Sequence, residues 1–201
     1  MFIYLKRSGP QILLDIRLDL LDWERHHIIN TDNLSESPTG LDIILSILDH
    51  IIPHLYRIRS LLFKCFSEST CLNTLFVLRG ASVPNLRQLE IKFDLFSAMF
   101  RNRLSRFRIL QHGSSQLTFL KIDQTDCLPV ITSLRMLTSL HSGKLYTDRN
   151  LSYPTLVEVL TAPDCLLYLS VAATWSRSTW PVHPDAPGFQ LHHLKALRIY
   201  D

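Results

Sequence analysis

Leucine and isoleucine recur along the chain in one short pattern. Two apolar residues stand three positions apart, and a β-branched or aromatic residue follows the second of them after one intervening position. The clearest copies are Leu86, Leu89 and Ile91; Leu117, Leu120 and Ile122; Leu166, Leu169 and Val171; Leu194, Leu197 and Ile199; and Ile58, Leu61 and Phe63. The last two apolar positions of each copy have the side-chain period of a β-strand. Each copy therefore predicts one short strand with one buried face.

Weaker copies extend the pattern to most of the chain. They are Leu13, Ile16 and Leu18; Leu72, Leu75 and Val77; Leu104, Phe107 and Ile109; and Leu137 with Leu140, where Ser142 replaces the final apolar residue. From Ile58 onward the copies begin 13 to 29 residues apart, an interval that brackets the roughly 20–29 residue period of leucine-rich repeats. The asparagine or cysteine of regular repeats is replaced by Phe66, Gly80, Asp94 and Thr125.

These observations predict an α/β fold: a degenerate leucine-rich-repeat solenoid with a parallel, curved sheet and short helices or loops on its convex side. The alternative is coincidence, because leucine pairs at this spacing also arise by chance in a chain that is 46% hydrophobic. Residues 12–20 alternate apolar and charged positions and predict a strand with one solvated face. Residues 41–52 have apolar positions at helical spacing and predict a helix that Pro53 ends.

Other segments predict the connections. Residues 22–40 read as a polar connector, residues 96–102 and 154–160 as short helices, and residues 174–190, with three of the chain's prolines, as a long irregular loop. With 201 residues, the chain fits one domain spanning 1–201. Met1 lies close to the first predicted strand and Asp201 directly follows the last, so we expect this domain to be truncated at both ends.

Composition narrows the class of function. A net charge of +3 without a run of like charges argues against a nucleic-acid or anionic-membrane partner. The four cysteines form no CxxC pair, the N-terminal segment is unlike a secretory signal, and no stretch of about 18 uncharged apolar residues occurs. We therefore expect an intracellular protein, cytoplasmic or nuclear, with reduced cysteines.

Residues that could carry catalysis are sparse. His50 and His54 are four apart, but Pro53 lies between them, and a solvated surface role is the better interpretation. The segment 111–116 (QHGSSQ) lacks the GxSxG turn of a hydrolase, and no glycine-rich phosphate-binding motif is present. We assign no catalytic residue, no metal site and no cofactor.

The residues between the inward leucines form the exposed concave surface of such a stack, where repeat proteins bind partners. Basic and aromatic residues alternate there, as in protein interfaces. Trp175 and Trp180, in the proline-containing loop, are predicted to anchor a partner at the rim or, alternatively, to cover the last repeats. The candidate partner-binding residues are Arg59, Phe76, Arg87, Glu90, Phe119, Lys121, Tyr168, Trp175, Trp180, Lys195 and Arg198.

The opening YLKRSGPQILLDIRLDL, the passage LDHIIPHLYRIRSLLF and the phrase SVPNLRQLEI together resemble the C-terminal part of fungal F-box proteins. In that family an F-box precedes a degenerate leucine-rich-repeat array. The resemblance covers essentially the whole chain, but no segment resembles the F-box itself.

The resemblance implies a protein-protein interaction module that recognises the target of an F-box-type ubiquitin ligase. The partner is then a target protein of unknown identity, and a ligase adaptor binds only if an F-box lies upstream of Met1. One alternative is a stand-alone repeat protein that scaffolds or inhibits a partner without a ligase. A third is an enzyme whose site the sequence does not reveal.

Overall fold

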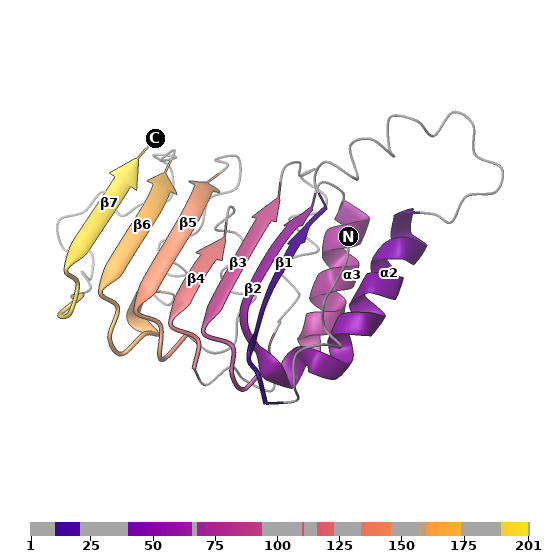
Figure 1. The fold of residues 1–201 in the computed structure, drawn as a ribbon. Coiled ribbons are helices and arrows are strands. Elements are labelled where there is room, and N and C mark those ends of the chain that lie inside the picture. The colour runs from indigo at the N-terminus through magenta and orange to yellow at the C-terminus, as the bar shows by residue number, and fades with distance from the viewer. Residues whose placement is uncertain are drawn as a thin grey trace.

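The computed structural model describes residues 11–20, 40–65, 68–93, 110, 116–122, 134–145, 157, 160–173 and 190–200. Seven strands in these ranges form one parallel sheet, ordered as they occur in the chain. They are β1 (Leu14–Asp19), β2 (Ile58–Cys65), β3 (Gln88–Phe93), β4 (Phe119–Ile122), β5 (Ser139–Leu145), β6 (Tyr168–Ala173) and β7 (Ala196–Tyr200) (Figure 1). The predicted α/β fold with a parallel sheet of successive chain segments is confirmed at this level.

Two rows of register partners run across the inner side of the sheet. The first inward row is Ile16, Leu61, Leu89, Leu120, Leu140, Leu169 and Leu197, and the second is Leu18, Phe63, Ile91, Ile122, Ser142, Val171 and Ile199. From β1 to β6, no side chain of the first inward row is more than 8% exposed. Burying one leucine contributes roughly 1.5–3 kcal/mol, so these rows supply the core that holds the strands together.

A tight turn before several strands adds a third apolar row. The backbone bonds run from Leu86 N–H to the Val83 carbonyl (3.1 Å), from Leu137 to Leu134 (3.0 Å) and from Leu194 to Leu191 (3.2 Å). Leu86 and Leu137 are both buried. The structural unit is therefore apolar-x-x-Leu-x-x-Leu-x-apolar, with one more apolar position than the sequence pattern that predicted it.

The entry to each of the later strands repeats one backbone arrangement. A carbonyl of one unit accepts hydrogen bonds from two consecutive N–H groups of the next. The acceptors are Arg87 (from Thr118 and Phe119), Thr118 (from Thr138 and Ser139), Thr138 (from Leu167 and Tyr168) and Leu167 (from Lys195 and Ala196), at 2.8–3.1 Å. Arg59 fits the same arrangement, because its carbonyl accepts a hydrogen bond from Arg87 N–H at 2.8 Å. We call the following positions the entry row: Arg59, Arg87, Thr118, Thr138, Leu167 and Lys195. Successive units thus stack with the same backbone geometry although their side chains differ.

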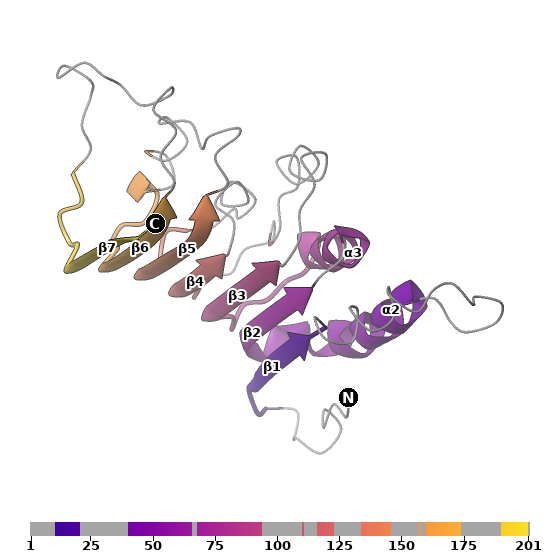
Figure 2. The ribbon, with the colours of Figure 1, turned by 90° about the horizontal axis from the view of Figure 1, so that it is seen from above.

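The helical elements lie on one side of the sheet (Figure 2). They are α2 (Gly40–Ile51), the 3₁₀ helix η2 (Ile52–Arg57) and α3 (Glu68–Arg79). The helix predicted over 41–52 is confirmed as α2, which buries Leu48 and Ile51 and leaves His50 exposed. Pro53 stands in the first turn of η2, where its missing N–H costs no helical hydrogen bond.

The strand predicted from Leu72, Leu75 and Val77 is wrong, because these residues belong to α3. In this helix Cys71, Leu75 and Leu78 are buried, and their spacing of four and three residues puts them on one helical face. Phe76 is consequently 63% exposed on the helical side of the sheet. It does not lie between inward leucines of a strand, which was the basis for its selection as a partner-binding residue.

The inward rows are exposed at β7. Leu197 is 55% and Ile199 52% exposed, although both continue the rows that are buried on β1 to β6. The strand β1 also pairs on one side only, but its Leu18 lies against Leu48 and Ile51 of α2. The helices α2 and α3 stand at the β1 end of the sheet (Figure 1) and do not cover β7, so the predicted inward burial of leucines is wrong for this strand.

Several sequence predictions lie outside the described residues. They are most of the polar connector over 22–40, the helix over 96–102, the weak strand at Leu104 to Ile109, most of the helix over 154–160, and the loop over 174–189 with Trp175 and Trp180.

Candidate interaction surface

The side of the sheet that faces away from the helices, here called the open face, carries two rows of outward side chains. The first outward row is Asp15, Ser60, Gln88, Phe119, Ser139, Tyr168 and Ala196, and the second is Arg17, Leu62, Glu90, Lys121, His141, Ser170 and Arg198. They point away from the core because successive strand residues alternate between faces. The inward rows are nearly uniform in chemistry, whereas the outward rows change from strand to strand.

The sheet brings most of the predicted binding residues together. Phe119 and Tyr168 belong to the first outward row, and Glu90, Lys121 and Arg198 to the second. The remaining ones on this surface, Arg59, Arg87 and Lys195, are exposed at the entry row along its rim. Phe76 lies on the opposite side, and Trp175 and Trp180 fall outside the described residues.

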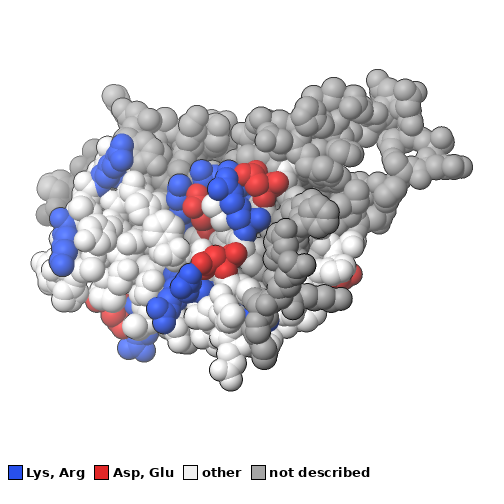
Figure 3. Space-filling model, in the orientation of Figure 1, with Lys and Arg blue, Asp and Glu red and all other residues white. Residues whose placement is uncertain are grey.

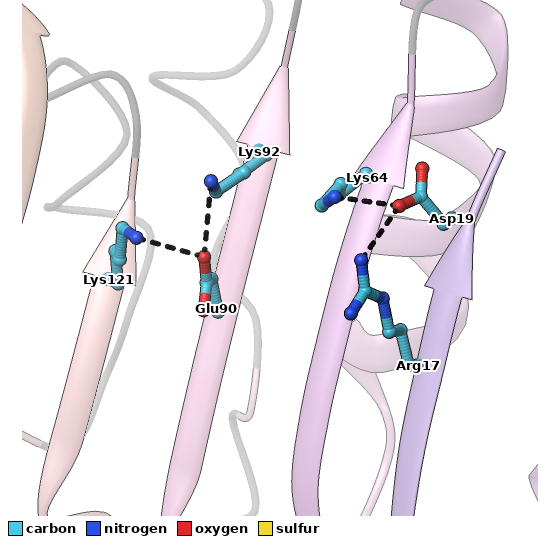
Figure 4. A network of polar contacts seen from close by, with 6 residues as sticks. All are labelled: Arg17, Asp19, Lys64, Glu90, Lys92 and Lys121. Atoms are coloured by element: carbon cyan, nitrogen blue, oxygen red, sulfur yellow. Dashed lines mark hydrogen bonds and ion pairs between the residues drawn. The ribbon is translucent and has the colours of Figure 1, made fainter. Parts of the chain in front are cut away.

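Opposite charges are paired over the first strands of the open face. Asp15 on β1 accepts hydrogen bonds from the Arg59 guanidinium, including one from Nε at 3.0 Å. Asp19 Oδ2 lies 2.6 Å from Lys64 Nζ and 3.3 Å from Arg17 Nη2 (Figure 4). Asp15 and Asp19 therefore both link β1 to β2, and Asp19 also contacts Arg17 of its own strand.

Glu90 makes the third such cluster. Its Oε1 lies 3.1 Å from Lys121 Nζ on β4 and 3.5 Å from Lys92 Nζ on β3 (Figure 4). Ion pairs at a protein surface typically contribute less than about 1 kcal/mol each. These clusters therefore set the local charge pattern of the open face more than its stability.

The sequence prediction missed the pairing of Asp15 with Arg59, which are 44 residues apart. The sequence predicts Arg59 as a partner-binding residue and Asp15 as part of a solvated strand face. The missing information was the register, since alignment of the apolar positions of ILLDIRLDL with those of RIRSLLFKC would have placed the acids of β1 beside the bases of β2.

The ionic contacts lower the pKa of both carboxyl groups of β1. For Asp19 the main cause is the hydrogen bond from Lys64, with a smaller effect from Arg17; for Asp15 it is the hydrogen bond from Arg59. A carboxyl group whose pKa is depressed by folding stabilises the fold above its unfolded pKa of about 3.9, and this stabilisation is lost as the pH falls through the folded value.

We therefore expect Asp19→Asn to lower the urea unfolding midpoint more at pH 6 than at about pH 2.5, because the wild-type carboxyl loses its charge, and with it the ion pair, as the pH falls through its depressed pKa. Lys64→Gln removes the other partner of the same ion pair. Its unfolding midpoint should likewise lie closer to that of the wild type at the lower pH. An equal difference between Asp19→Asn and the wild type at both pH values would contradict the pairing.

The later strands carry a different surface. On β4 to β6 the outward rows hold Phe119, Lys121, Ser139, His141, Tyr168 and Ser170. Phe119 and His141 contact each other with ring centroids 5.1 Å apart, and Tyr168 is 46% exposed. Figure 3 shows positive and negative side chains gathered over the first strands and an uncharged area towards the β7 end of the sheet. Aromatic side chains are enriched at protein-binding surfaces.

His141 stands at the boundary between these two areas. Burial lowers its pKa from the ordinary value near 6.5, and the positive charge of Lys121 acts in the same direction. The imidazole is therefore neutral at pH 7, where it provides a hydrogen-bonding ring beside Phe119 and not a further cation.

A second exposed apolar area lies on the helical side. An open groove of about 540 Å³ lies between η2 and the end of α3. It is lined by Ile52, Leu55, Phe76, Val77, Arg79, Gly80 and Ala81. This groove contains Phe76, and it provides a natural comparison for experiments on the open face.

Within the described ranges, no group of three or more histidine, cysteine or acidic side chains is placed to bind a metal ion. The cysteines there, Cys65, Cys71 and Cys165, form no disulfide bond. The helices of this part of the chain are too short or too polar to cross a bilayer.

Comparisons with protein-family models, with curated proteins and with solved structures find no match to this chain. What the open face binds must therefore be inferred from its own residues.

Proposed function

We propose that this chain is a degenerate leucine-rich-repeat solenoid that recognises a protein through the open face of its sheet. The observation that carries this proposal is the contrast between the rows: leucine and isoleucine dominate the inward rows, whereas the outward rows change at every strand. A constant core with a variable, exposed sheet surface is the design by which repeat proteins bind partners.

The resemblance to fungal F-box proteins supports a particular setting, in which the bound protein is the target of a ubiquitin ligase. An F-box upstream of Met1 would then connect this chain to the ligase adaptor. The alternative is a stand-alone repeat protein that scaffolds or inhibits its partner. Mapping the 5′ end of the native transcript separates the two, because the first requires an open reading frame that continues upstream into an F-box.

The recognition surface itself is tested by substitution of one aromatic residue on each side of the sheet. The full chain is immobilised, a retained protein is identified and purified, and its affinity is measured by titration. We expect Tyr168→Ala to weaken binding about tenfold or more, because exposed aromatic residues dominate interface energies.

Phe76→Ala is the matched control, since Phe76 is also aromatic and exposed but lies in the groove on the helical side. It should leave the affinity unchanged. Loss of binding in Phe76→Ala with normal binding by Tyr168→Ala would move recognition to the helical side and contradict the proposal. Unfolding midpoints of both variants verify that each is folded.

A further inference from the structure

The charge of the open face changes along the sheet. Its acidic residues among those described, Asp15, Asp19 and Glu90, all lie on β1 and β3, and each is paired with a cation. From β4 to β7 the described outward and entry-row residues include Lys121, Lys195 and Arg198 and no acid. The one described acid in this half, Asp164, lies in the turn before β6 and is paired with Arg135 at 2.7 Å.

The basic residues enclose the aromatic area. In the second outward row Lys121, His141, Ser170 and Arg198 follow one another on consecutive strands. Since neighbouring strands are about 4.8 Å apart, Lys121 and Arg198 are separated by roughly 14 Å. Phe119 and Tyr168 flank Ser139, whose side chain is small, in the first outward row.

Lys121 can accept a second carboxylate although it already contacts Glu90. The Lys121 ammonium has three donors, and Glu90 Oε1 also has Lys92 Nζ at 3.5 Å. On β1 and β3 the cations of the open face contact the protein's own carboxylates. On the later strands a carboxylate of the partner can take that role.

We infer that the partner segment is an acidic, extended peptide that crosses β4 to β7, with an apolar side chain between Phe119 and Tyr168 and flanking carboxylates at Lys121 and Arg198. This inference rests on the proposed function. An extended chain advances about 3.3 Å per residue, so carboxylates four residues apart span roughly 13 Å and match the two cations. Residues two apart share one side of the peptide, which gives the recognition pattern acidic-x-apolar-x-acidic.

A protein segment fits this surface better than a nucleic acid does. The basic residues of this half are few, and they are separated by uncharged serine, histidine and aromatic side chains. A nucleic-acid strand carries closely spaced phosphates and is bound through many basic contacts. Here two or three charges flank an apolar contact, as in a protein interface.

The test is selection of peptides from a display library of random 12-residue sequences on the full chain. We expect the enriched sequences to be acidic and to carry the acidic-x-apolar-x-acidic pattern. Enrichment should fall at least tenfold on the double variant Lys121→Glu with Arg198→Glu, and also on Lys121→Gln with Arg198→Gln, which removes the charges without reversing them.

Arg17→Glu is the matched control, because Arg17 lies in the same outward row at the other end of the sheet. It should leave the enrichment unchanged. Neutral or basic peptides that are lost on Tyr168→Ala would overturn this inference while the proposed recognition surface stands. Peptides whose enrichment is unchanged by Tyr168→Ala and by the charge variants would overturn both the inference and the proposed recognition surface. The same holds if no peptide is enriched at all.

Nucleic acid is the remaining outcome. A fluorescein-labelled 20-nucleotide single strand is titrated with the full chain at 150 mM NaCl, with the same charge variants in parallel. We expect no saturable binding under these conditions. Binding that is lost in the Lys121 and Arg198 variants would assign the basic half to nucleic acid and overturn the inference.

Discussion

Replacing Leu120 by alanine should lower the free energy of unfolding by about 2–5 kcal/mol, the range for large-to-small substitutions in a protein core. Leu120 is 0% exposed and occupies the first inward row between Leu89 and Leu140. The substitution removes buried methyl groups in the middle of the sheet and leaves a cavity that the flanking leucines cannot fill. Urea unfolding followed by circular dichroism measures the change.

Leu197→Ala is the matched control for this prediction. Leu197 occupies the same row on β7 but is 55% exposed, so its replacement removes much less buried area and should lower stability by less than about 1 kcal/mol. Equal losses for the two substitutions would mean that β7 is covered as the inner strands are. A loss below 1 kcal/mol for Leu120→Ala would contradict the assignment of the inward row as the core.

The strands could be predicted because their apolar spacing is set by local geometry. A leucine followed two positions later by isoleucine or valine puts both side chains on one face of a strand, and that holds for Leu89 with Ile91 and for Leu169 with Val171. The pattern does not indicate whether a neighbouring unit covers that face. The exposed leucine of β7 was therefore predicted as buried, because burial depends on neighbours that the local sequence does not specify.

The helix α3 was predicted as a strand for a different reason. The spacing of Leu75 and Val77 fits a strand, but the neighbouring buried set of Cys71, Leu75 and Leu78 fits a helix. The helical pattern was obscured because its buried face also contains Thr70 and Thr74, each 2% exposed, while the apolar Phe76 faces outward. Weak amphipathicity of this kind leaves the choice between strand and helix to tertiary packing.

The composition of the open face was predicted from the sequence, but its division into two halves was not. The residues between the inward leucines were identified correctly on β3, β4, β6 and β7. The division depends on which outward residues become neighbours, and this requires the register between segments that are 44 or 45 residues apart, as for Asp15 with Arg59 and Asp19 with Lys64. Local patterns determine the face on which a residue lies, whereas the lengths of the connections determine its neighbour.

Arg57 provides the second large expected effect. This side chain is 4% exposed, and its Nε donates a hydrogen bond to the Ile12 carbonyl at 3.0 Å, which joins η2 to the segment entering β1. Arg57→Ala should lower the free energy of unfolding by about 2–3 kcal/mol, because a buried charge-assisted hydrogen bond is lost and the carbonyl loses a donor. Hydrogen exchange should show the loss of protection concentrated in β1.

Arg59→Ala separates burial from charge in the same experiment. Arg59 has the same side chain two residues later, but it is exposed on the open face in its pair with Asp15, so its replacement should leave the unfolding midpoint nearly unchanged. Arg57→Lys should rescue little, because a lysine ammonium does not reproduce the planar Nε–H donor. If Arg57→Ala and Arg59→Ala cost the same, the stabilising element at β1 is the surface charge and not the buried bond to Ile12; if Arg57→Ala alone exposes β1 to exchange, η2 holds the first strand in the sheet.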